Sequence, residues 1–276
     1  MPILRIFITV LLCSSFHVFA KTSPESCLSA REFITTLEYL RSKKDFAMDD
    51  IHAQSLAHKV SKGCTGSAQR FITSVEVLSK VEAGTRVAMD IGLKLSQHSD
   101  AYAKSFIGLF KKSYLKEYFD LDMQTSLKIA TSLSLDYKGN VEQALSDYFK
   151  VSEFCIGKEV NLPPPICAQL AQEIVKNNEH STHSVAEAFI RVYRFVQETE
   201  SLKSPVKDAL AISRKVVAVD PNAATNFIEG YKYAISEKGL KFSAQQSLTL
   251  AYQMVERTSV PENPLNSETN RMPASK

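Results

Sequence analysis

Apolar residues recur along this chain at a spacing that predicts amphipathic helices. In the segment that begins at Ala30, they occupy Phe33, Ile34, Leu37 and Leu40. Apolar residues one, four and seven positions after the first share one face of an α-helix, whereas a half-buried strand alternates at every second residue. The pattern therefore predicts a helix with one buried face.

The same helical pattern occurs six times. The matching segments begin at Ala30, Ala68, Ala103, Glu142, Ala186 and Ala224. Each is followed by a second apolar pattern, and in three units the interval between the two is 21 residues, namely from Phe106 to Leu127, from Phe189 to Leu210 and from Phe227 to Leu248. A constant interval indicates a repeated helical hairpin, with the Phe-Ile pairs of the first helices as its packing anchors.

These repeats predict an all-α fold of about six helical hairpins, each about 38 residues long, stacked as an α-solenoid. Stacking is expected because one hairpin cannot bury both of its apolar faces. The alternative is an irregular all-α bundle, since amphipathic helices resemble one another by chance. The predicted repeat domain spans residues 21–258, with units at 28–66, 67–100, 101–139, 140–182, 183–221 and 222–258.

The segment "VDPNAATNFIEGY" (219–231) resembles the boundary between tetratricopeptide repeats. The interval of this chain is longer than the period of about 34 residues in those repeats, so the likeness is to α-solenoids as a superfamily. That resemblance implies a binding or scaffold role.

The first twenty residues, "MPILRIFITVLLCSSFHVFA", have the pattern of a secretory signal peptide. Arg5 precedes an apolar run, and the segment ends in small and apolar residues, so we expect cleavage after Ala20. The alternatives are an uncleaved anchor helix and lipidation at Cys13, although Leu12 stands where lipoprotein signals have a small residue. We expect export to a periplasm or beyond the cell, with no further membrane span.

Four cysteines follow this segment, and an even count in an exported chain predicts disulfides. Cys27 and Cys64 lie at the two ends of the first predicted hairpin, and Cys155 and Cys167 flank the loop of the fourth. Neighbouring positions in a hairpin give the pairing Cys27–Cys64 and Cys155–Cys167. The alternative is four free, buried thiols.

Composition narrows the range of partners. The chain has 276 residues and a formal net charge of +3, which gives no strong electrostatic attraction for nucleic acid or anionic membranes.

The tail at 259–276 has a disordered composition. No catalytic or phosphate-binding motif is present, and "HSTH" (180–183) has the polar composition of a loop, so we expect neither a metal nor a cofactor.

One surface pattern suggests where a partner binds. The residue after the third apolar position of the first helix is Lys111, Arg194 or Lys232 in three units, and Tyr193 and Tyr231 precede the last two. One interpretation is a core aromatic residue beside a solvated charge. The other is a partner-binding face formed by these five residues.

The sequence therefore predicts an exported, non-enzymatic α-solenoid that recognises another macromolecule, a protein or an envelope polymer. The alternative is a secreted all-α enzyme that acts on a cell-wall polymer, because catalytic carboxylates need no local motif.

Overall fold

A computed structural model describes residues 28–81, 83–200 and 202–258, and these residues form twelve α-helices and no strand. The predicted signal peptide, Cys27 and the tail at 259–276 lie outside the described residues. The helices are α1 (Ala30–Ser42), α2 (Asp50–Ser61), α3 (Ser67–Ser79), α4 (Thr85–Ser96), α5 (Asp100–Tyr114), α6 (Met123–Ala130), α7 (Val141–Ile156), α8 (Pro164–Asn177), α9 (Val185–Glu198), α10 (Val206–Val217), α11 (Ala223–Ile235) and α12 (Ala244–Thr258).

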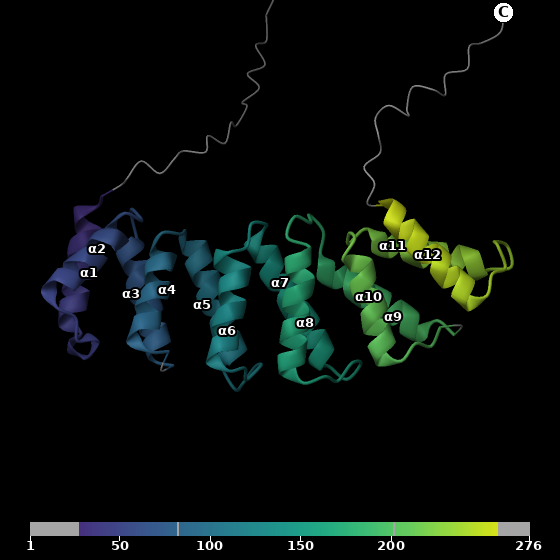
Figure 1. Ribbon diagram of the computed structural model, residues 1–276, viewed down its shortest axis with the longest axis horizontal. Helices are drawn as coiled ribbons and strands as arrows, with labels where there is room; N and C mark the ends of the chain where they lie inside the picture. The colour runs from purple at the N-terminus through teal and green to yellow at the C-terminus, as the bar shows by residue number, and fades with distance from the viewer. Residues whose placement is uncertain (1–27, 82, 201, 259–276) are drawn as a thin grey trace, which may run out of the picture.

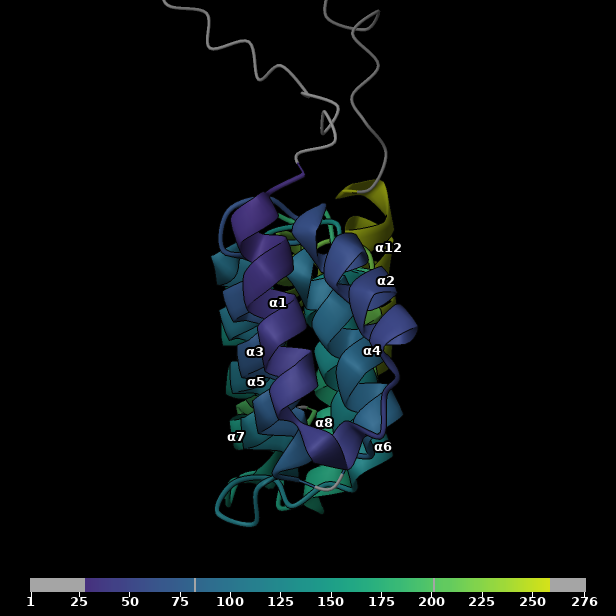
Figure 2. The same ribbon diagram turned by 90° about the vertical axis from the view of Figure 1, so that its left-hand side faces the viewer.

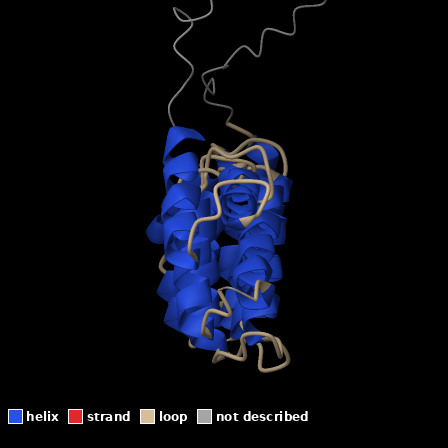
Figure 3. Cartoon of the chain, turned by 90° about the vertical axis from the view of Figure 1, so that its right-hand side faces the viewer, coloured by secondary structure: helices blue, strands red, loops and turns tan. Residues whose placement is uncertain are grey.

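Consecutive helices pack as six hairpins, and the hairpins stand side by side in a single row (Figure 1). Viewed from either end, the row has two layers (Figures 2 and 3). One layer contains the first helices of the hairpins, from α1 to α11, and the other contains the second helices, from α2 to α12. The predicted all-α stack of helical hairpins is confirmed.

Polar side chains begin several of these helices. Ser29, Asp49, Asn140 and Ser184 are N-cap residues, and each side chain accepts a hydrogen bond from a backbone N–H of the first turn. Such caps satisfy donors that have no partner within the helix.

One large residue of each first helix is the centre of its unit, and we call it the anchor. In interior and last units the anchor is completely buried; these residues are Phe71, Phe106, Tyr148, Phe189 and Phe227. In the first unit it is Phe33, which is partly exposed, since no hairpin precedes it among the described residues.

The predicted register of the fourth unit was wrong. The sequence pattern placed Leu145 at the anchor position, but that side chain is only partly buried, whereas Tyr148 is fully buried. Residues three apart lie on the same face of a helix, so the apolar pattern alone does not distinguish the two.

The second helices approach the anchors closely because each carries two small, buried residues four positions apart. These pairs are Ala53 and Ala57, Ala88 and Gly92, Ser126 and Ala130, Cys167 and Ala171, Ala209 and Ser213, and Ser247 and Ala251. A Cβ atom added at Gly92 would lie 2.8 Å from Val75 Cγ2, which shows how closely α3 and α4 approach one another.

The hairpin loops of the last four units share one geometry. Each contains a residue in the left-handed region, with φ of 48° at Asp120, 57° at Asn161, 36° at Lys203 and 53° at Lys241. The residue after it donates its N–H to a carbonyl seven residues beyond the anchor; the pairs are Leu121 to Ser113, Leu162 to Cys155, Ser204 to Val196, and Phe242 to Ala234. The repeat thus extends to the loops, although the loop of the fourth unit is one residue shorter than the other three.

A disulfide joins Cys155 of α7 to Cys167 of α8, with the two Cα atoms 5.4 Å apart. This half of the predicted pairing is confirmed, and both residues are fully buried. The pairing of Cys64 with Cys27 stays a prediction, since Cys27 lies outside the described residues.

Candidate functional site

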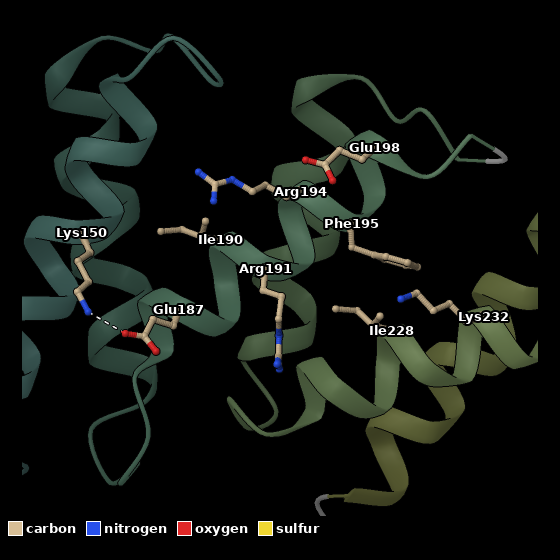
Figure 4. Close-up of a pocket in the computed structure, with 9 residues that line it drawn as sticks. All are labelled: Lys150, Glu187, Ile190, Arg191, Arg194, Phe195, Glu198, Ile228 and Lys232. Atoms are coloured by element: carbon tan, nitrogen blue, oxygen red, sulfur yellow. Dashed lines mark hydrogen bonds and ion pairs between the residues drawn. The ribbon is translucent and has the colours of Figure 1, made fainter.

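A shallow groove crosses the first-helix layer over α7, α9 and α11 (Figure 4). Its volume is about 670 Å³, and it is lined by Lys150, Glu187, Ile190, Arg191, Arg194, Phe195, Glu198, Ile228 and Lys232. The lining contains four cationic and two anionic side chains. The groove therefore has a positive balance of charge around an apolar centre.

Three side chains form the apolar centre of the groove: Ile190 and Phe195 from α9, and Ile228 from α11. Each is only partly buried. The Phe195 ring packs edge-on against Tyr231, with centroids 5.6 Å apart, and this contact orients it between the two units. The groove thus presents an apolar surface, and the Phe195 ring within it packs on the buried Tyr231.

Two of the four cations in the groove form ion pairs. Lys150 Nζ lies 2.9 Å from Glu187 Oε1, and Arg194 donates two hydrogen bonds to the Glu159 carboxylate in the loop before α8. The hydrogen bonds from Arg194 lower the pKa of Glu159. These side chains are largely exposed, so each pair is screened by water.

The other two cations have neutral neighbours. The Arg191 guanidinium donates a hydrogen bond of 2.8 Å to Thr225 Oγ1, and Lys232 Nζ lies 5.8 Å from the centre of the Phe195 ring. Within the described residues, neither cation forms an ion pair. Their charge is available to a carboxylate of a ligand.

The structure brings together two of the five residues predicted for a partner-binding face. Arg194 and Lys232 line the groove, while Lys111 is exposed on α5, outside it. Tyr193 and Tyr231 are buried, with exposed fractions of 1% and 0%, and the Tyr193 hydroxyl donates to the Glu159 carbonyl. Both tyrosines therefore belong to the core and lie beneath the face, as the first of the two interpretations has it.

The sequence pattern missed several residues of the groove. Lys150 and Arg191 each follow an anchor by two positions, and Phe195 follows one by six. The Phe-Ile pairs were expected to be packing anchors. Their phenylalanines after Phe33 are fully buried, and their isoleucines pack against the core while partly exposed, except for Ile34, which is exposed. Ile190 and Ile228 face the groove, which a comparison of residues at equal distances from the anchors would have indicated.

The two buried carboxylates of the described residues have structural partners. Glu32 accepts hydrogen bonds from the backbone N–H groups of Gly66 and Ala68 at the start of α3. Asp147 accepts hydrogen bonds from the Ser184 hydroxyl and the Val185 N–H at the start of α9. Each carboxylate links its unit to the next one.

No group of three or more His, Cys, Asp or Glu side chains that could hold a metal occurs in the described ranges. In the "HSTH" loop, His183 Nδ1 lies 3.2 Å from Thr182 Oγ1. Every helix from α1 to α12 is too short or too polar to span a bilayer.

No family model, curated protein or solved structure matches this chain. The fold itself gives the class: an array of α-helical hairpins with a cationic, apolar-centred groove on its first-helix layer.

Proposed function

We propose that the protein is an exported, non-enzymatic α-solenoid that binds an acidic, partly apolar segment of another protein in the groove over α7, α9 and α11. The observation that carries this proposal is the position of Arg191 and Lys232 on either side of Phe195 and Ile228 (Figure 4). A ligand with carboxylates beside apolar side chains complements that arrangement.

Energetics favour a peptide over a small molecule. The groove is open and shallow, so the binding of a compact ligand would remove little of its surface from water. A segment that lies across three successive first helices would contact a cationic residue on each of them, and apolar residues on α9 and α11. Extended surfaces of this kind are what stacked hairpins provide.

Export is supported by two features of the chain. The disulfide between Cys155 and Cys167 is of the type that persists in oxidising compartments. The first twenty residues have the pattern of a signal peptide. Together the two features support a periplasmic or extracellular location.

The binding test uses a short amphipathic peptide with glutamates, and a counterpart in which lysines replace the glutamates. We expect fluorescence anisotropy to show binding of the acidic peptide only. Arg191→Glu and Lys232→Glu should each weaken binding about tenfold, which corresponds to about 1.4 kcal/mol. Lys207→Glu, an exposed reversal on α10 in the other layer, is the matched control and should leave binding unchanged.

Equal binding of both peptides, or equal loss in the control variant, would contradict the groove as the site. Affinity capture from the native compartment would then identify the natural partner, with the Lys232→Glu protein as the comparison sample.

A further inference from the structure

We propose that the array continues from one molecule to the next: the last hairpin of one copy docks on the first hairpin of a second copy, in the register that joins neighbouring hairpins within the chain. The two end faces differ from those of a capped solenoid, whose terminal repeats have polar outer faces. At the first end Ile34 is 52% exposed, and at the last end Tyr233 is 58% exposed.

Contacts between hairpins within the chain define the register. In the first, fourth and fifth units, the residue six positions after the anchor is aromatic and packs edge-on against the anchor of the next unit. Tyr39 contacts Phe71, Phe154 contacts Phe189, and Phe195 contacts Phe227, with ring centroids 6.4, 6.4 and 6.3 Å apart. Tyr233 occupies this position in the last unit, where the chain supplies no further anchor among the described residues.

The last hairpin loop also exposes apolar residues whose equivalents within the chain are buried. In the third unit, Phe119 and Leu121 are buried, and the Phe119 ring lies 6.1 Å from the ring of the next anchor, Tyr148. The equivalent residues of the last unit are Leu240 and Phe242, with exposed fractions of 42% and 37%. Both loops have a left-handed residue 14 positions after the anchor, Asp120 and Lys241, followed by the same backbone hydrogen bond to the first helix, so these side chains occupy equivalent positions in the two loops.

The first hairpin offers the complementary surface. Its anchor Phe33, together with Leu37 four residues later, is partly exposed, although the anchors of the later units are completely buried. These are the positions that receive the preceding aromatic residue within the chain. Phe33 and Leu37 of a second copy are therefore the expected contacts of Tyr233.

Charge at the two ends fits the same register. Within the chain, the residue two positions after an anchor bonds to the residue two positions before the next anchor, as Lys150 does to Glu187 and Arg191 does to Thr225. At a junction between copies these positions are occupied by Glu229 and Arg31, which have opposite charges and are exposed.

A second pair supports the junction. Glu159, eleven residues after its anchor, pairs with Arg194, five residues after the next anchor. At the junction, the residues at the same distances from their anchors are Lys238 and Glu38, again exposed and opposite in charge. The last loop is one residue longer than the fourth, so Lys238 lies three residues before the left-handed Lys241, whereas Glu159 lies two before Asn161. Because the two faces differ, the contact is head-to-tail and allows growth beyond two copies.

Sedimentation velocity of the full exported chain over a concentration series tests the junction. We expect the mass of the wild-type protein to rise with concentration without a plateau at two copies. Glu229→Arg alone and Arg31→Glu alone place like charges at every junction, so each should weaken self-association at least tenfold. An equimolar mixture of the two variants contains only opposite charges at its mixed junctions, and assembly should return. Glu142→Arg and Lys128→Glu, exposed on α7 and α6, are matched controls that should assemble like the wild type.

Tyr233→Ala should also weaken assembly at least tenfold while the circular dichroism spectrum stays unchanged. The proposal is overturned if the wild type remains monomeric at its highest soluble concentration, if the single reversals assemble normally, or if their mixture does not assemble. Assembly that occurs only after residues 259–276 are removed would show that this segment covers the end face, and would also overturn it. None of these outcomes depends on the groove.

Discussion

The carboxylate of Glu32 accepts a hydrogen bond from the backbone N–H of Ala68, 2.8 Å away and 36 residues later in the chain. Glu32 directly precedes the anchor of the first unit. Asp147 directly precedes the anchor of the fourth unit and binds the Val185 N–H at the start of α9 in the same way. A carboxylate at a helix N-terminus meets unpaired donors and a favourable dipole, so it links two hairpins without any apolar contact.

Replacement of Glu32 by Gln should lower the free energy of unfolding by about 1 to 3 kcal/mol. The amide has one accepting oxygen where the carboxylate has two, so one of the buried N–H groups loses its partner. Urea denaturation measures the change. Glu38→Gln, exposed on the same helix, should stay within about 0.5 kcal/mol of the wild type. Equal effects of the two variants would mean that the link from Glu32 to α3 contributes nothing.

Phe189→Ala should destabilise the protein by about 3 to 5 kcal/mol, through lost burial and the cavity that remains. Phe189 is fully buried in an interior unit, and the Phe154 ring of the preceding unit packs against it. Its loss should uncouple the last two hairpins from the others, so that denaturation shows more than one transition. Lys207→Ala, on the exposed side of α10, is the control and should change stability by no more than about 0.5 kcal/mol. A single transition at the wild-type midpoint for Phe189→Ala would contradict the assignment of the anchor.

The repeats predicted the fold because the spacing of their apolar residues reflects the periodicity of the α-helix. That periodicity is a property of each local segment. Phe189 and Val196 are seven residues apart, and apolar residues at this spacing share one face of a helix. The spacing therefore identifies the buried face of the helix, whatever the position of the helix in the fold. Contacts between units were not predicted, because they depend on which residues face the neighbouring hairpin. The position before the anchor is Glu32, Arg70 or Asp147 in different units, so no single residue type marks it.

The candidate site was predicted only in part for a related reason. Arg194 and Lys232 were singled out by their sequence position, and they do lie in the groove. Tyr193 was singled out with them, although a residue four positions after an anchor lies on the buried face of the helix. The groove itself arises from the spacing of α7, α9 and α11, which the sequence of one unit does not specify.

Arg194→Gln should raise the pKa of Glu159 back toward its ordinary value. In the wild-type protein, hydrogen bonds from the Arg194 guanidinium hold that pKa below the usual range. Because the folded-state pKa is lowered, the pair stabilises the fold at neutral pH, and this contribution is lost as the pH falls through the pKa of Glu159. NMR titration of the Glu159 carboxyl group measures the shift. Arg191→Gln serves as the control, and a Glu159 titration that is identical in the two variants would exclude Arg194 as the cause.

Removal of the disulfide by Cys155→Ala and Cys167→Ala should lower the free energy of unfolding by about 2 to 4 kcal/mol. The bridge joins residues 12 apart, and a loop of that size restricts the unfolded chain by about this much. Because both sulfurs are buried, a reductant should cleave the bridge only when the hairpin opens. Denaturation of wild type and variant, each with and without reductant, separates the effects. If the stability of the variant still changes with reductant, a second bridge exists, as the predicted pairing of Cys27 with Cys64 requires. Equal stability of wild type and variant would contradict a structural role for the bridge between Cys155 and Cys167.

Two helical glycines should respond to alanine in opposite directions. Gly108 is exposed on α5, and a Cβ atom there meets no atom within 4 Å. Since alanine favours the helix, Gly108→Ala should stabilise the protein by about 0.5 to 1 kcal/mol.

Gly92, by contrast, is buried on α4, where a Cβ atom would lie 2.8 Å from Val75 Cγ2 and 3.2 Å from Phe71 Cδ2. The first contact is closer than packed atoms allow and the second is unusually tight, and a valine side chain within the core has little freedom to move. The strain should exceed the gain in helix propensity, so Gly92→Ala should destabilise the protein by about 1 to 3 kcal/mol. Thermal and urea denaturation of both variants decide the matter. If Gly92→Ala stabilises as Gly108→Ala does, then α3 and α4 lie further apart in solution than the small residues of the second helices imply.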